Sequence, residues 1–248
     1  MSVLLRGLLL AGGLSCVLWS LVIGPSFWEM VPARDAATRI IADERFKPGT
    51  LADVLRRIEA KLELELSQPE LAWARALIQL RIAEEAMARK GSEEADGQIF
   101  KAEESVQAAL AVSPSDSFLW VLLYSVQATR NGFAPQSVRY LGQSYVAGPL
   151  EGWISMRRNR LALAVFPILN GTTQTAVIAE FAKMVDADFI EDAALNLTGK
   201  GWQQREQLLA ALGSVDLASK QALYKRLAIE GMRLSVPGVV EDERPWRR

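Results

Sequence analysis

Residues 99–124, IFKAEESVQAALAVSPSDSFLWVLLY, decide the fold that we predict for this chain. The first half carries apolar residues at helical spacing, and the helix is expected to stop at Ser113-Pro114 because proline cannot continue it. Ser115-Asp116 is a typical helix start, since short polar side chains cap the first turn. Residues 118–124 are then apolar or aromatic without interruption, and the run is too short to cross a bilayer. The pattern predicts two helices joined by a tight turn, the second being the most buried helix of the protein.

The same helical periodicity extends outward in both directions, and no segment alternates with a period of two. One amphipathic helix is predicted after Thr50, another from Pro69 to about residue 90, and a loop at residues 91–97, GSEEADG. Further helices are predicted at residues 137–146, 150–169, 173–186, 191–197, 202–212 and 217–234. The predicted fold class is therefore all-α.

The N-terminal region has the composition of a membrane segment. Residues 7–23, GLLLAGGLSCVLWSLVI, contain no charge, and as a helix they would extend about 25 Å. With residues 3–5 added, the helix approaches the roughly 30 Å of a bilayer core, and Pro25 is expected to end it. We predict a transmembrane helix here, anchored by Leu8, Leu9, Leu10, Val17, Leu18, Trp19, Leu21, Val22 and Ile23.

Two other interpretations of this segment stay open. A cleaved signal peptide would need a small-residue cleavage site, which residues 21–28 do not offer. Lipidation of Cys16 would be expected to follow a large aliphatic residue three positions before the cysteine. This chain has Gly13 at that position, in Gly13-Leu14-Ser15. We therefore prefer an uncleaved anchor, which predicts a single-pass membrane protein with its helical domain outside the cytoplasm, periplasmic if bacterial.

The organisation that follows has four parts. Residues 1–24 form the membrane anchor, and residues 25–49 a juxtamembrane linker with a short helix. Residues 50–236 form the helical domain, and residues 237–248 a charged tail.

Composition excludes several classes of function. The 28 Lys and Arg residues nearly balance the 29 Asp and Glu residues, so we expect no nucleic-acid partner. The chain has no His and only one Cys, which removes the commonest general base, internal disulfides and Cys-based zinc sites. Thr198-Gly199-Lys200-Gly201 lacks the remainder of a phosphate-binding loop. We expect no cofactor, no metal site and no enzymatic activity.

One basic cluster within the helical region is a candidate site. Arg157, Arg158 and Arg160 lie close to Trp153 and Met156, and arginine presents a planar fork of donors to anions. The cluster is a candidate contact for an anionic ligand or a partner carboxylate. Its alternative is a solvated helix face paired with acidic neighbours.

The junction Ala102…Val106…Ala109-Leu110…Pro114…Trp120…Leu123 resembles the tetratricopeptide repeat over roughly residues 70–150. In that family small residues let two helices pack closely, a proline starts the turn to the next repeat, and a Trp follows six residues later. Pro114 and Trp120 keep this offset, and Pro149 follows Pro114 after 35 residues, against a repeat of 34. The resemblance implies stacked helical hairpins with a concave partner-binding face. A compact helical bundle is the alternative architecture.

These observations predict a membrane-anchored interaction scaffold or accessory subunit of a cell-envelope assembly, of the secretion or polysaccharide-export type. Its partners would be another membrane or envelope protein and, through residues 3–23, the lipid bilayer. The alternative is an extracytoplasmic helical protein, released from a signal peptide, that binds a small or glycan ligand. The oligomeric state stays open.

Overall fold

The computed structural model describes residues 3–42, 44–47, 49–62, 69–89, 92–149 and 151–240, for some of which only the backbone is described. Within these ranges the chain contains helices and turns and no strand, so the prediction of an all-α fold is confirmed. The chain divides into two compact units, residues 1–112 and residues 113–248.

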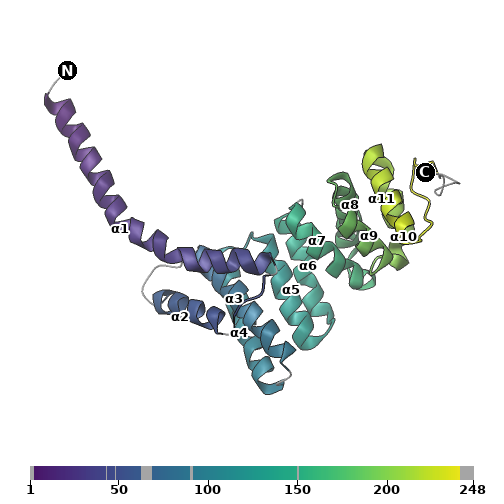
Figure 1. Cartoon of the computed structure of the whole chain (residues 1–248), viewed down its shortest axis with the longest axis horizontal. Coiled ribbons are helices and arrows are strands. Elements are labelled where there is room, and N and C mark those ends of the chain that lie inside the picture. The colour runs from purple at the N-terminus through teal and green to yellow at the C-terminus, as the bar shows by residue number, and fades with distance from the viewer. Residues whose placement is uncertain are drawn as a thin grey trace. The chain divides into compact units, whose positions relative to one another are not determined.

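The first unit is built around a helical hairpin. Helix α3 (Pro69–Ala88) packs along α4 (Ser92–Val112), and both α1 (Val3–Ile41) and α2 (Thr50–Leu62) pack on α3 (Figure 1). The hairpin packs closely because small side chains lie between the helices. Its buried alanines are Ala72, Ala74, Ala76, Ala83, Ala86, Ala95, Ala102 and Ala109.

Helix α1 differs from the prediction at its C-terminal end. It continues through Pro25 and Pro32 to Ile41, so the predicted helix end at Pro25 is wrong. A proline within a helix costs about 3 kcal/mol. Packing of the last turns, where Ala33, Ala36 and Ala37 are buried, offsets this cost.

The prediction of a transmembrane helix is also wrong, and with it the single-pass membrane localisation. In the described ranges, no helix has both the length and the apolar composition that a membrane crossing needs. Residues 3–24 do not form a separate anchor. They form the first half of the longer helix α1, whose second half belongs to a folded core.

The predicted anchor residues all lie in the part of α1 that extends away from the rest of its unit (Figure 1). The side chains of Leu8, Val22 and Ile23 lie outside those that the structure describes. The remaining anchor residues are exposed, namely Leu9, Leu10, Val17, Leu18, Trp19 and Leu21.

The acidic segment at residues 91–97 was predicted as a loop, and this is wrong as well. Helix α4 already begins at Ser92. Ala95, Ile99 and Ala102 are buried at helical spacing, which continues the packed face of the helix into the acidic segment. Acidic residues near a helix start are favourable because they face the positive end of the helix dipole.

The second unit begins with the hairpin of α5 (Ser117–Asn131) and α6 (Pro135–Ala147). Helices α7 (Gly152–Ala164), α8 (Gly171–Asp186) and α9 (Ile190–Thr198) follow and pack on one another. Helix α11 (Leu217–Ile229) packs on α8 and α9 and completes the core. The remaining elements are η1 (Phe166–Ile168), η2 (Trp202–Gln204), α10 (Arg205–Ala210) and η3 (Ala211–Ser214).

Helix α5 confirms the opening prediction from the sequence. The Asp116 side chain caps the helix by accepting hydrogen bonds from the backbone N–H groups of Phe118 and Leu119. In the run from 118 to 124 every side chain except that of Trp120 is buried. The Trp120 indole N–H donates to the Pro114 carbonyl oxygen at 2.8 Å and closes the turn before the helix.

Candidate functional site

The second unit contains a buried polar network where α6, α7 and α8 meet. Two glycines allow the backbone to approach its neighbours closely at this point. A Cβ atom on Gly148 would lie 2.6 Å from the Ser117 hydroxyl oxygen, and one on Gly152 would lie 3.1 Å from the Phe189 ring. A larger residue at Gly148 would require Ser117 or the backbone to move, and one at Gly152 would require the Phe189 ring to shift by a few tenths of an ångström.

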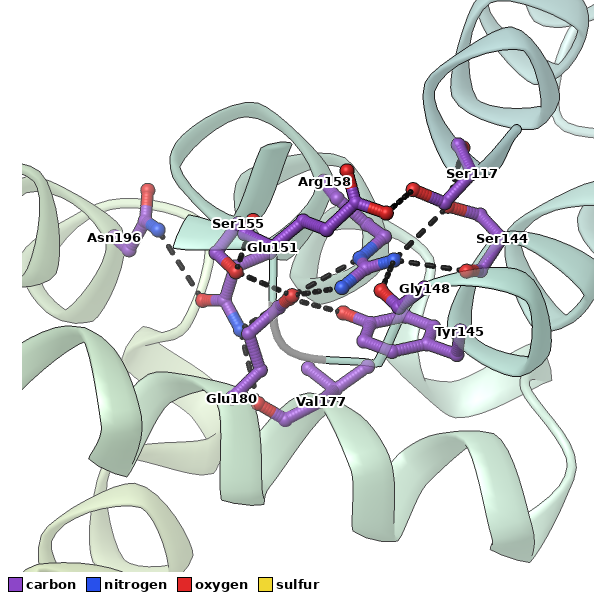
Figure 2. Close-up of polar contacts among 11 residues, drawn as sticks. Ser117, Ser144, Tyr145, Gly148, Glu151, Ser155, Arg158, Val177, Glu180 and Asn196 are labelled. Atoms are coloured by element: carbon purple, nitrogen blue, oxygen red, sulfur yellow. Dashed lines mark hydrogen bonds and ion pairs between the residues drawn. The ribbon is translucent and has the colours of Figure 1, made fainter. Parts of the chain in front are cut away.

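Arg158 lies at the centre of the network and is fully buried (Figure 2). Its Nη1 donates to the carbonyl oxygens of Ser144 and Gly148, both at 2.9 Å. These carbonyls belong to the C-terminal end of α6, where a helix leaves acceptors without intrahelical partners. The guanidinium of Arg158 therefore acts as a C-terminal cap for α6, and its Cζ atom lies 4.2 Å from the centre of the Tyr145 ring.

Glu180 of α8 carries the charge that balances Arg158. Its Oε1 accepts from Arg158 Nε at 3.0 Å and Nη2 at 2.5 Å, and from the Ser155 hydroxyl at 2.8 Å. Its Oε2 accepts from the Tyr145 hydroxyl at 2.6 Å. Burial of the phenol, and next to it the negative charge of Glu180, raise the pKa of Tyr145 well above its ordinary value.

The network continues outward through amide and hydroxyl groups. The Ser144 hydroxyl donates to the Ser117 carbonyl oxygen at 2.8 Å, which reaches α5. Asn159 donates to the Val177 carbonyl oxygen at 2.9 Å and accepts from Asn196 of α9 at 3.2 Å. One set of hydrogen bonds thus connects five successive helices, α5 to α9.

This arrangement is suited to holding helices in register rather than to reacting with a substrate. Arg158, Glu180, Ser144, Asn159 and Asn196 are all buried, and their polar groups bond to one another or to helix backbone. A buried ion pair is tolerated when further hydrogen bonds satisfy both charges, as they do here. Neither charged group is presented to solvent.

The structure separates the three arginines that the sequence grouped together. Arg158 points into the core, whereas Arg157 and Arg160 are exposed. Trp153 is 44% exposed and lies on the outer side of α7, four residues before Arg157 and seven before Arg160. We call Trp153, Arg157 and Arg160 the α7 stripe, because this spacing places them on one face of the helix.

Sequence reasoning missed Glu180 and Tyr145 as partners of Arg158. The spacing of both charged residues from buried apolar residues on their helices contained a signal for this ion pair. Arg158 stands at the position four residues after buried Ile154, and Glu180 three residues after buried Val177. A charged residue on the apolar face of each of two successive helices indicates a buried ion pair.

Comparisons with known proteins add no relative: no family model, no curated protein and no solved structure matches this chain. The helical fold is confirmed by the structure, whereas the tetratricopeptide resemblance stays a prediction.

Proposed function

We propose that this protein is an interaction scaffold or accessory subunit, which presents helix faces to protein partners through hairpins stacked like those of tetratricopeptide repeats. The observation that carries the proposal is the division of α7 into two faces. Its inner face is fixed by the Arg158–Glu180 pair, and its outer face presents an exposed Trp and two exposed Arg residues. Trp and Arg are enriched among the residues that dominate binding energy in protein interfaces.

The rigid frame supports this function physically. A surface that is already ordered loses less conformational entropy on binding than a flexible one, so more of the contact energy becomes affinity. The hydrogen bonds that link α5 to α9 supply this order within the second unit. The buried charged side chains stabilise the packing of the helices. The charged side chains that would contact a partner lie on the surface.

Site-specific photo-crosslinking in cells that produce the full-length chain tests the proposal. A photoreactive phenylalanine analogue replaces one exposed residue at a time: Glu104 of α4, Arg160 of α7 or Lys225 of α11. We expect at least one position to give a discrete crosslinked protein, and the purified partner to bind the full-length chain. A chain that crosslinks to no protein from any of these faces would refute the scaffold function.

A further inference from the structure

We propose that the extended segment after α11 covers a docking site on the helical core, and that it detaches when a partner segment of the same apolar pattern binds there. We call residues 232–240 the strap. The inference rests on the proposed function and names the partner class for one surface of the second unit. The partner is an extended peptide with apolar side chains at alternate positions.

The side chains of the strap alternate between the core and solvent. Met232 and Leu234 are partly buried and pack against the apolar core, and Val236 is only 2% exposed. Arg233 and Ser235, which lie between them, are exposed. This period of two is typical of an extended chain that lies with one side on an apolar surface.

A tight turn returns the end of the strap to the core. The Val239 N–H donates to the Val236 carbonyl oxygen at 3.0 Å, and Gly238 has a φ of 82°. With Pro237 and Gly238 at its centre, this is a type II turn. Pro237 also restricts Val236 to an extended conformation. The most buried residue of the strap is therefore held in its bound conformation by its own neighbour.

The strap, drawn in yellow, runs beside α11 (Figure 1). At its start, the Met232 N–H donates to the Leu227 carbonyl oxygen in the last turn of the helix, at 2.9 Å. Towards its end, a Cβ atom on Gly238 would lie 3.5 Å from the Nζ of Lys220, a residue of the first turn. The strap thus follows α11 back from its C-terminal end to its beginning.

Apolar side chains hold the strap in place, rather than a ladder of backbone hydrogen bonds. Within the part of the chain that the structure describes, no backbone hydrogen bond joins residues 233–238 to another element. Segments of this kind can open locally while the rest of a protein stays folded. An open strap would expose part of the apolar cluster that contains Leu223 and Leu227 of α11.

The strap itself indicates the chemistry of the partner. A segment that replaces it must cover the same apolar surface, which selects apolar side chains at every second position and a small branched one where Val236 lies. The partner binds only those molecules whose strap is open, so its apparent affinity is reduced by the closed fraction. Release of the strap is therefore expected to strengthen binding.

The first test asks whether the strap opens in the folded, full-length protein. Cysteine replaces Val236 of the strap or Leu223 of α11, both of which are buried, and Cys16→Ser removes the single native cysteine. We expect a thiol reagent to label Val236→Cys at least about tenfold faster than Leu223→Cys under native conditions. Equal rates would mean that only global unfolding exposes the strap, and would overturn the proposal.

The second test measures binding of a fluorescent peptide to the full-length protein by anisotropy. The probe has the sequence of residues 232–240, and its counterpart carries Val236→Asp. In the protein, Val236→Asp releases the strap, and Ser235→Asp is the matched control because it adds the same charge at the neighbouring exposed position. We expect the probe to bind the Val236→Asp protein at least about tenfold more tightly than the parent or the control, and the counterpart peptide to bind none of them.

Three results of the second test would overturn the proposal. Val236→Asp could lose its helical circular dichroism, which would make the strap a part of the core that cannot detach. A folded Val236→Asp protein could fail to bind the probe. The parent could be a dimer by light scattering that Val236→Asp converts to a monomer, which would assign the surface to the strap of a second copy. Crosslinks to a partner in cells alongside any of these results would preserve the scaffold function and refute only the role of the strap.

Discussion

At the scale of single residues, two buried tyrosines show how a hydrogen-bond partner changes the contribution of a hydroxyl group to stability. The Tyr145 hydroxyl donates to Glu180, whereas the buried Tyr124 hydroxyl has no partner in the parts of the chain that the structure describes. We expect Tyr145→Phe to destabilise the protein by about 1.5–3 kcal/mol, the usual range for a bond to a charged group. Tyr124→Phe is expected to leave stability unchanged or raise it slightly. Urea unfolding at neutral pH measures both, and equal losses would contradict the network.

Tyr145 also predicts a pH dependence of stability. Its pKa is raised in the folded protein, so the folded state holds the phenolic proton at a pH where the unfolded chain has lost it. The contribution is complete below the unfolded pKa of about 10 and is lost as the pH rises above that value. We expect the parent to lose stability more steeply than Tyr145→Phe above about pH 10. Parallel slopes in chemical unfolding across this range would refute the assignment.

At the scale of whole elements, the ends of two helices use the same backbone motif with different residues. Asp188 after α8 and Gly231 after α11 both have left-handed backbone conformations, with φ of 64° and 76°. In each case the next residue donates back to the last helical turn, from Phe189 to Met184 and from Met232 to Leu227, both at 2.9 Å. Both are Schellman motifs, in which glycine is the residue without steric cost.

This contrast makes the two positions a matched pair. Asp188→Gly is expected to raise the free energy of unfolding by about 0.5–1 kcal/mol, because it removes backbone strain from an exposed turn. Gly231→Ala is expected to lower it by about 1 kcal/mol for the opposite reason. Thermal unfolding of both variants checks the signs. A loss of stability in Asp188→Gly would show that the Asp side chain supports the turn.

The ion pair between α7 and α8 gives a prediction about how elements are joined. Arg158→Met and Glu180→Leu are each expected to cost about 3–5 kcal/mol, because each leaves one buried charge without its counterion. The double variant is expected to cost clearly less than the sum of the two. Denaturant unfolding of all four proteins gives the coupling energy. Additive losses would mean that the two charges do not depend on each other.

Elements were predictable where a local signal sets the boundary. Thr50 and Pro69 begin α2 and α3, and the Ser113–Asp116 turn separates α4 from α5, as their capping and proline signals indicate. Errors arose where packing between distant segments overrides the local signal. Helix α1 continues past Pro25 because its end is buried on α3. Helix α4 starts early because Ala95 is buried at helical spacing with Ile99 and Ala102.

The candidate site was predictable only in part, for a related reason. Arg157, Arg158 and Arg160 were identified by their type and proximity, but type alone does not distinguish an inward from an outward arginine. The partner of Arg158 lies 22 residues away on another helix. Its identity depends on how α7 and α8 pack, which no local pattern specifies.

At the scale of the whole molecule, the second unit contains an apolar cluster and a polar network of its own. The large apolar cluster of the second unit is made of residues between Tyr124 and Val239, and its polar network of residues between Ser117 and Asn196. Every described residue of this cluster and of this network belongs to residues 113–248. A core supplied by one continuous segment is the usual property of a domain that can fold alone.

We therefore expect residues 113–248, produced alone, to fold cooperatively with helical circular dichroism and a single unfolding transition. Arg158→Met in this fragment should cost the same free energy as in the full chain, because every partner of Arg158 is retained. That equality separates a native fragment from a compact but loosely packed helical state, in which one buried charge pair would have little effect. A broad transition, or a variant that unfolds like the parent fragment, would show that the second unit needs the first to complete its core.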